Sequence, residues 1–397
     1  MIQDRYLHTS IREDLTRKMV FIGGPRQVGK TTLARLIGQK EYPAYRIFNW
    51  DDPAGKKSIL SMRFGHGPAL IVFDELHKYT KWKNHIKGIF DTKADDLHIL
   101  VTGSARLDLY RRGGDSLMGR YHYYRLHPFS LAEALGDDTA LTMPSVSIDT
   151  TLIFQPVAPR ANEILHTLLE FGGFPEPFLT KDSHLLRRFH NDRLVRLIKE
   201  DIRDLESVRD LSSLQILADL LPEKVGSLFS LNALREDLLV THKTVALWVD
   251  VLERFYYHFR IYPFASTKIK SLRKEPKLYL WDWSQVKDSA RRFENLVASH
   301  LLKIVHFLYD AQGYRTELHF LRDRAGHEVD FLVTLDKRPW FAVEVKQSDA
   351  DIHAPLLYFG NKLKIPYLYQ VVETSGLDFL KQGVRVISAD KFLAGLV

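Results

Sequence analysis

The stretch MVFIGGPRQVGKTT, residues 19–32, joins an apolar run to a complete G-x-x-x-x-G-K-[ST] motif. The run MVFIG predicts a buried strand, and the amphipathic pattern over residues 30–39 predicts a helix that begins within the motif. Glycines in such a loop let backbone N–H groups turn inward without a Cβ in the way, and a helix N-terminus adds partial positive charge. The sequence therefore predicts a phosphate-binding loop between a strand and a helix.

This loop predicts that the chain binds ATP together with Mg²⁺. The ammonium group of Lys30 would lie on the β- and γ-phosphates, and the hydroxyl of Thr31 would complete the coordination of Mg²⁺. The residues expected to surround the phosphates are Gly24, Pro25, Arg26, Gln27, Val28, Gly29, Lys30, Thr31 and Thr32.

A second apolar run, ALIVFDE over residues 69–75, ends in two carboxylates. The carboxyl ends of parallel strands meet at one edge of a sheet, so both side chains are expected beside the loop. Asp74 would bind Mg²⁺ directly or through water, and Glu75 would orient or deprotonate the attacking water. The alternative is a strand followed by an aspartate that caps a helix, but together with the loop the pair favours hydrolysis of the triphosphate.

The first third of the chain alternates apolar runs with amphipathic segments, a pattern typical of a parallel sheet with helices on both faces. Further strands are expected at residues 45–49, 97–102 and 121–126, and further helices at residues 81–91 and 104–112. We therefore expect an α/β fold in which residues 1–140 form a P-loop domain on a parallel sheet.

Polar and basic residues after the fourth expected strand are candidates for completing the site. Ser104 could sense the γ-phosphate or the attacking water, or it could cap the following helix. ATPases that assemble into rings take an arginine from the neighbouring subunit to stabilise the transition state. Arg120 is the first candidate for this arginine and Arg112 the second. Arg106 and Arg111 belong to the same cluster, and any of the four could instead be an ordinary surface residue.

The remainder of the chain predicts three further regions. Residues 141–224 are expected to form a connector and a helical region, because turn-rich sequence gives way to helical patterns. Residues 225–266 have the rhythm of a winged helix, with a turn at residues 239–242 between two helices. Residues 267–397 are expected to form a smaller α/β domain.

Basic residues near the winged-helix pattern favour DNA as a partner. Thr241, His242 and Lys243 stand at the start of the second helix, the position from which such helices contact DNA. The neighbouring segment TKIKSLRKEPK, residues 267–277, has five basic residues and one acidic residue. We interpret this segment as a strip that contacts phosphates. The alternative is that the winged helix contacts protein instead.

The last region contains a set of residues typical of a metal-dependent nuclease. Asp330 lies on one expected strand, and Glu344 and Lys346 lie on the same face of the next, because strand side chains alternate. Such a D…E-x-K arrangement is that of the restriction-endonuclease fold, in which the carboxylates bind Mg²⁺ and the lysine helps to activate water. Glu294, on the preceding helix, is a further candidate ligand. The alternative is that the fold is kept for binding alone, without cleavage.

An ordered series of motifs resembles a large prokaryotic family of AAA+ ATPases, and it extends over nearly the whole chain. The resemblance implies an AAA+ core, a winged helix and a C-terminal domain, long of unknown function, with a restriction-endonuclease-like fold, and it implies assembly into a hexameric ring. The motifs are GPRQVGKTT (24–32), FDE (73–75), TGSAR (102–106), MGR (118–120), HPFSLAE (127–133), GGFPE (172–176), KEDI (199–202), PKLY (276–279), FEN (293–295) and EVDF (328–331).

Composition excludes several classes of protein. Among 397 residues, 56 Lys+Arg and 49 Asp+Glu give a net charge of +7, which permits binding to a polyanion without requiring it. The absence of cysteine excludes disulfide scaffolds and thiolate zinc sites, and it fits a reducing cytoplasm. No stretch approaches the roughly 20 apolar residues that cross a bilayer, so no membrane partner is expected.

Three functions agree with these patterns. The first is a Mg²⁺-dependent ATPase ring that translocates or remodels DNA, including branched DNA such as Holliday junctions. The second is a regulatory or defence protein that ATP switches and that signals through its C-terminal domain. The third is a DNA endonuclease gated by ATP, with Asp330, Glu344 and Lys346 as its active site.

Overall fold

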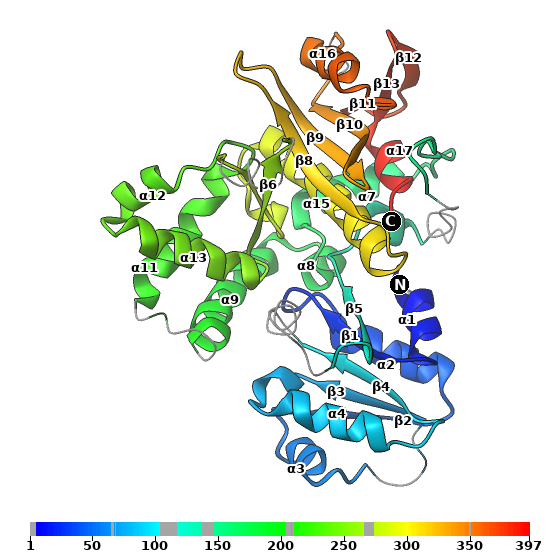
Figure 1. Ribbon diagram of the computed structural model, residues 1–397. Coiled ribbons are helices and arrows are strands. Elements are labelled where there is room, and N and C mark those ends of the chain that lie inside the picture. The colour runs from blue at the N-terminus through cyan, green and yellow to red at the C-terminus, as the bar shows by residue number, and fades with distance from the viewer. Residues whose placement is uncertain are drawn as a thin grey trace. The chain divides into compact units, whose positions relative to one another are not determined.

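The computed structural model describes residues 5–64, 67, 69–103, 117–136, 146–203, 208, 210–265, 274–348 and 351–397. They form two compact units, each with a sheet of its own (Figure 1). The first unit extends to His127 and includes Arg254–Tyr256, and the second consists of Pro128–Glu253 and Tyr257–Val397. The domain boundaries predicted after residues 140, 224 and 266 stay predictions.

The first unit is built on five parallel strands in the spatial order β2-β3-β4-β1-β5, which confirms the expected parallel α/β sheet (Figure 1). The strands are β1 (Met19–Gly23), β2 (Tyr45–Asn49), β3 (Leu70–Asp74), β4 (His98–Thr102) and β5 (Tyr121–Arg125). The helices are α1 (His8–Leu15), α2 (Lys30–Glu41), α3 (Pro53–Ser61), the 3₁₀ turn η1 (Leu76–Lys78) and α4 (Trp82–Thr92). The helix expected over residues 104–112 lies outside the described residues.

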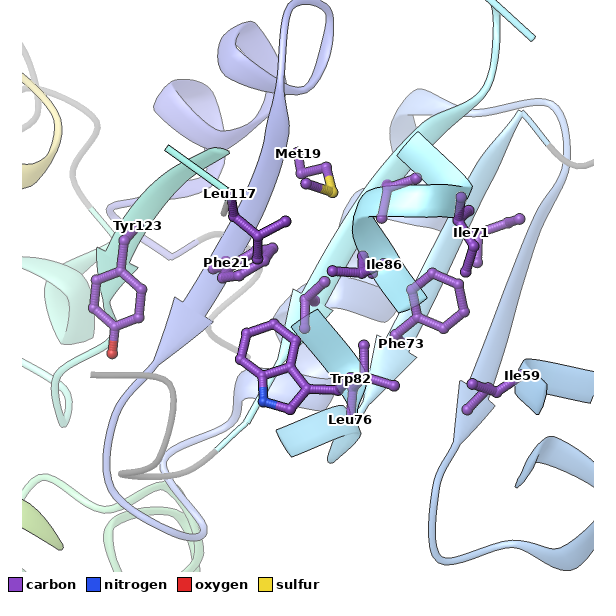
Figure 2. Close-up of a cluster of buried hydrophobic side chains, with 13 residues drawn as sticks. Met19, Phe21, Ile59, Ile71, Phe73, Leu76, Trp82, Ile86, Leu117 and Tyr123 are labelled. Carbon is purple, nitrogen blue, oxygen red and sulfur yellow. The ribbon is translucent and has the colours of Figure 1, made fainter. Parts of the chain in front are cut away.

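One face of this sheet packs against α4. Phe21 on β1 and Phe73 on β3 belong to the same buried cluster as Trp82, Ile86 and Ile89 of that helix (Figure 2). The three α4 residues recur at helical spacing, so they form a single apolar stripe. Strand residues between those of the cluster point to the opposite face, because side chains alternate along a strand. This packing holds β1 and β3 against α4, and the predicted site lies at the carboxyl ends of these two strands.

Helices form much of the second unit. In chain order they are α6 (Leu131–Leu135), α7 (Ala161–Phe171), α8 (Pro175–Thr180), α9 (Ser183–Arg196), the π-helical segment η4 (Leu197–Ile202), α11 (Leu211–Leu220), η5 (Leu221–Lys224), α12 (Leu231–Leu238), α13 (His242–Arg254), η6 (Trp283–Gln285), α15 (Ser289–Asp310), α16 (Ala354–Leu363) and α17 (Ala389–Ala394). Among all the described helices of the chain, none is long and apolar enough to cross a bilayer.

The helix-turn-helix pattern expected from the sequence corresponds to α12 and α13. Leu239 ends α12 in the left-handed region, with φ of 54°, and Thr241 Oγ1 accepts a 3.2 Å hydrogen bond from the Thr244 N–H at the start of α13. Strand β6 (His258–Pro263) follows and pairs with β7 (Lys277–Leu280), but it also pairs with β8 (Thr316–Arg322). The strand that follows the two helices is therefore part of a larger sheet, and the winged helix stays a prediction.

That larger sheet has eight strands in the order β12-β13-β11-β10-β9-β8-β6-β7 (Figure 1). Its other strands are β9 (Glu328–Leu335), β10 (Arg338–Lys346), β11 (Tyr367–Val372), β12 (Asp378–Lys381) and β13 (Val384–Ser388). Strand β8, with the sequence TELHFLR, mixes polar and apolar residues without strict alternation. Antiparallel pairing of β9 with β10 brings the D…E-x-K residues onto neighbouring strands.

Candidate functional site

The predicted phosphate-binding loop follows β1, and α2 begins at its lysine. Gly24 and Gly29 have φ of 145° and 99°, in a region that L side chains rarely adopt. A Cβ on Gly24 would lie 2.4 Å from the carbonyl oxygen of Leu126, so a larger residue does not fit there. The Lys30 ammonium group is buried and donates to the carbonyls of Gly24, at 3.1 Å, and Pro25, at 2.8 Å. The loop thus forms a compact turn around Lys30 Nζ.

Asp74 is the centre of a hydrogen-bond network at the same edge of the sheet. Thr31 Oγ1 donates to its two carboxylate oxygens at 3.1 and 3.2 Å, and Asn49 Nδ2 donates at 3.0 Å. Thr102 Oγ1 donates to the same carboxylate from the end of β4. Asp74 is only 4% exposed, so these donors stabilise its negative charge away from bulk water.

Asn49 and Thr102 are residues that the sequence analysis missed. Each is the last residue of a strand beside β3, so parallel pairing places both at the end of β3 with Asp74. A polar residue at the carboxyl end of each neighbouring strand is the signal that could have revealed them. Both hold the carboxylate of Asp74 in one orientation.

Glu75, the predicted catalytic carboxylate, is held in an unusual backbone conformation. Its φ is 57°, in the left-handed region, and its N–H donates to the Thr102 carbonyl at 3.1 Å. Its Oε2 lies 3.5 Å from His77 Nε2 and 3.9 Å from Lys78 Nζ, and its side chain is 25% exposed. Glu75 is therefore adjacent to the network of Asp74 but, unlike Asp74, reaches solvent.

The donor set around Asp74 fits Mg²⁺. A carboxylate and a hydroxyl supply hard oxygen ligands, and Mg²⁺ in nucleotide sites takes few protein ligands besides phosphate and water. Thr31 and Asp74 would hold the ion, with Asn49 and Thr102 orienting the carboxylate.

A second contribution to the loop comes from the N-terminal segment, which the sequence analysis also missed. Arg5 is 6% exposed and donates to the Val28 carbonyl at 3.0 Å and to the His127 carbonyl at 2.5 Å. The Tyr6 hydroxyl donates to the Arg125 carbonyl at 2.6 Å. These bonds join the phosphate-binding loop to the end of β5.

Of the other predicted residues of this unit, Ser104, Arg106, Arg111 and Arg112 lie outside the described residues. Arg120 is described, and its guanidinium donates to both carboxylate oxygens of Asp91 at 2.8 and 3.2 Å. This hydrogen bond lowers the pKa of Asp91. The Arg120 carbonyl accepts the Met19 N–H at the amino end of β1, the edge opposite the loop.

In the second unit, two of the predicted nuclease-like residues, Asp330 and Glu294, contact a buried lysine. Lys277 is 2% exposed, and its Nζ lies 2.8 Å from Glu328 Oε1, 3.3 Å from Asp330 Oδ1 and 3.5 Å from Glu294 Oε1. These charges outweigh burial and raise the pKa of Lys277 above its ordinary value. Lys277 was expected in the basic strip of residues 267–277, and its burial corrects that expectation. Residues 267–273 of the strip lie outside the described residues.

Glu344 and Lys346 pair with each other next to Asp330. Lys346 Nζ donates to Glu344 Oε1 at 2.6 Å, and His353 Nε2 lies 3.3 Å from the same oxygen. The Asp330 N–H donates to Glu344 Oε2 at 3.3 Å. Burial, reinforced by the charge of Asp330, raises the pKa of Glu344 to about 8 and that of Glu294 to about 7.

This second set does not fit the divalent cation expected from the sequence. Glu294 and Asp330 both contact the ammonium group of Lys277, and Glu344 accepts the Asp330 N–H, so a cation of the protein itself already lies at these carboxylates. Within the described part of the chain, no group of three or more histidine or acidic residues is arranged to hold a metal ion.

Comparison with known proteins agrees with the fold of the first unit. A family model described as an AAA domain matches residues 16–135. Two domains of unknown function, DUF8612 and DUF4143, match residues 162–290 and 291–392. An uncharacterized protein of Mycobacterium tuberculosis is 24% identical over 285 residues, which cover 71% of this chain. One of Methanocaldococcus jannaschii is 24% identical over 275 residues, or 66% of this chain, and the matches cover 58% of each relative's length.

Two solved structures are also similar. The Walker-type ATPase PABY2304 of Pyrococcus abyssi has 13% identity and a TM-score of 0.39, over 74% of this chain and 99% of that one. The RuvB Holliday junction branch migration motor of Thermotoga maritima has 17% identity and a TM-score of 0.32, over 68% and 93%. The family model and the parallel sheet that carries the loop together lead to one conclusion: residues 16–135 form a P-loop domain of the AAA type.

Proposed function

We propose that this chain is a Mg²⁺-dependent ATPase that assembles into a ring, a hexamer in our proposal, and uses ATP hydrolysis to act on DNA. The observation that carries the ATPase activity is the contact of Thr31 with Asp74, two oxygen ligands from separate motifs that meet next to the loop. Because both side chains lie beside Lys30, one site holds phosphate-binding and metal-binding groups together.

Each residue of the site then has a defined task. The loop amides and the N-terminus of α2 bind phosphate oxygens, and Lys30 Nζ exchanges the carbonyls of Gly24 and Pro25 for phosphate oxygens. Mg²⁺, when bound by Thr31 and Asp74, supplies positive charge to the phosphate oxygens. Glu75, which reaches solvent, orients the attacking water and accepts its proton.

DNA binding is supported by the second unit. Thr241, His242 and Lys243 are exposed at the start of α13, where a recognition helix presents its side chains and its positive dipole end. The net charge of +7 also permits binding to a polyanion such as DNA.

Assembly into a ring is supported by the location of Arg120. It lies at the amino end of β1, so the five residues of that strand, roughly 16 Å, separate it from the loop of its own subunit. Arg120 is thus too far from its own loop to act there, and in our proposal it completes the site of a neighbouring subunit.

The test is steady-state ATP hydrolysis by the full chain with Mg²⁺, alone and with single-stranded, duplex and four-way DNA. We expect hydrolysis by the wild type, stimulation of several-fold by at least one DNA, and loss of activity in Lys30→Ala. Glu75→Gln should bind ATP without turning it over. A chain that binds no nucleotide would contradict the ATPase, whereas hydrolysis that no DNA changes would contradict only the DNA part and favour an ATP-switched regulator.

A further inference from the structure

Lys277 contacts three members of what we call the carboxylate cluster, formed by Glu294, Glu328, Asp330 and Glu344, and the fourth, Glu344, accepts the Asp330 N–H. We propose that Lys277 is the permanent cation of this cluster and takes the place that a divalent metal ion would occupy. The second unit is then a metal-free module that does not cut DNA, although its sequence contains the acidic residues expected of a nuclease.

The contacts of Lys277 show how completely its charge is compensated inside the protein. Three carboxylates, from Glu294, Glu328 and Asp330, have an oxygen within 3.5 Å of its Nζ. The side chain is 3% exposed, so water contributes little to the solvation of the ammonium group. A buried ammonium group is tolerated only when it is paired and hydrogen-bonded, and here the carboxylates supply this compensation.

The backbone holds Lys277 in place from two sides. On one side Lys277 pairs with Ile261 of β6, and on the other it forms a bridge with Leu228. The Phe229 N–H also donates to the carbonyl of Pro276, at 2.8 Å. The backbone of Lys277 is therefore fixed within a strand. A surface lysine could move aside for an incoming ion, whereas Lys277 is held in place.

The carboxylates are also engaged by other donors. The Tyr279 hydroxyl donates to Glu294 Oε1 at 2.7 Å, and the Val345 N–H donates to Asp330 Oδ2 at 3.0 Å. Both oxygens of Glu344 accept hydrogen bonds, one from Lys346 Nζ and one from the Asp330 N–H. A divalent cation needs oxygens that converge on it at about 2.0 to 2.6 Å. Here one oxygen each of Glu294, Glu328 and Asp330 converges on Lys277 Nζ instead, at 2.8 to 3.5 Å.

The test measures Mn²⁺ binding to the full chain by the loss of the free Mn²⁺ electron paramagnetic resonance signal, without nucleotide. All proteins carry Asp74→Asn, so the site of the first unit does not contribute. We expect Lys277→Met to bind one Mn²⁺ per chain, and we expect Asp330→Asn to abolish that binding. The parent protein, and the control Lys277→Arg, which keeps the charge, should show no binding that depends on Asp330.

Two results would overturn the proposal. One is binding of Mn²⁺ by the parent protein that disappears in Asp330→Asn. The other is a folded Lys277→Met protein, judged by circular dichroism, that gains no Mn²⁺ site. If Lys277→Met does not fold, the comparison of the parent protein with Asp330→Asn still tests whether the parent binds Mn²⁺ through Asp330. ATP turnover is not measured, so failure here is distinguishable from failure of the proposed ATPase.

Discussion

Thr31 and Asp74, separated by 43 residues in the chain, are joined by hydrogen bonds of 3.1 and 3.2 Å from the Thr31 hydroxyl to both carboxylate oxygens. Thr31 follows β1 and Asp74 ends β3, and β4 lies between these strands in the sheet. Thr102, at the end of the intervening strand β4, donates to the same carboxylate. The pair that we propose to bind Mg²⁺ is therefore brought together by strand order.

The first prediction concerns the hydroxyl of Thr31. Thr31→Val keeps the shape of the side chain but removes the oxygen that faces Asp74, so we expect Mg²⁺-dependent ATP turnover to fall by about 100-fold or more. Thr31→Ser keeps the hydroxyl and should retain activity within a few-fold. Turnover at saturating ATP over a range of Mg²⁺ concentrations measures the difference. Equal activity of the two variants would contradict a role of this hydroxyl in metal binding.

The second prediction concerns Arg5. Arg5→Ala leaves the buried carbonyls of Val28 and His127 without the guanidinium donor, which costs about 1 to 3 kcal/mol of stability. It also frees the loop from the end of β5, so we expect nucleotide affinity to fall by about 10-fold. Fluorescence titration with a labelled ATP analogue, well below the unfolding temperature, measures this affinity.

The matched control for Arg5 is Arg12→Ala. Arg12 belongs to the same N-terminal segment, but its side chain is 48% exposed and lies 3.9 Å from Glu41, so its removal should leave affinity unchanged. A lower stability of Arg5→Ala with unchanged affinity would mean that Arg5 supports the fold without positioning the loop.

The third prediction concerns Arg120 and its partner Asp91. If Arg120 acts on a neighbouring subunit, Arg120→Ala should lower the turnover number by about 1,000-fold and leave ATP affinity unchanged. Asp91→Asn removes the same ion pair but keeps the arginine, and exposed ion pairs contribute little to stability, so its activity should stay near that of the wild type.

Mixing two inactive variants tests the same prediction independently. Lys30→Ala subunits supply Arg120, and Arg120→Ala subunits supply an intact loop, so mixed assemblies should recover part of the lost activity. A mixture no more active than its components, or a chain that stays monomeric in light scattering with ATP, would exclude this role for Arg120.

Local patterns were sufficient to predict the parallel sheet and the loop. Strand β1, the loop and α2 are contiguous, so the apolar run, the glycines and the helical periodicity are all visible in one short segment. Asp74 was predicted for the same reason, since it ends a second buried run. These features depend on sequence spacing and on the general rule that parallel strands end at one edge.

The features that could not be predicted from the sequence depend on contacts between distant segments. Arg5 reaches His127 across 122 positions, and Lys277 reaches Asp330 across 53. Nothing in the sequence near Lys277 indicates that its charge is buried among carboxylates, because four other basic residues accompany it in residues 267–277. The same residue type serves as surface charge or as buried cation according to tertiary structure alone.

The fourth prediction concerns the pH dependence of stability and rests on His300. Its Nε2 accepts the Leu131 N–H at 3.0 Å, and its Nδ1 lies 2.8 Å from the Leu296 carbonyl, an arrangement that requires the neutral ring with the proton on Nδ1. Burial lowers the pKa of His300 to about 4. The unfolded chain, with an ordinary histidine pKa near 6.5, therefore binds more protons than the folded chain between pH 6.5 and pH 4.

It follows that the contribution of His300 to the free energy of unfolding is fully present above about pH 6.5 and is lost as the pH falls toward 4, by about 2 kcal/mol at pH 5. His300→Gln keeps an acceptor for the Leu131 N–H but cannot be protonated, so it should be less stable at pH 7.5 and lose about 2 kcal/mol less on acidification. Urea unfolding of both proteins at pH 7.5 and pH 5.0 gives this difference. His242→Gln, at an exposed position, should follow the wild type at both values. An equal loss in His300→Gln and the wild type would show that His300 is protonated in the folded chain as readily as in the unfolded one.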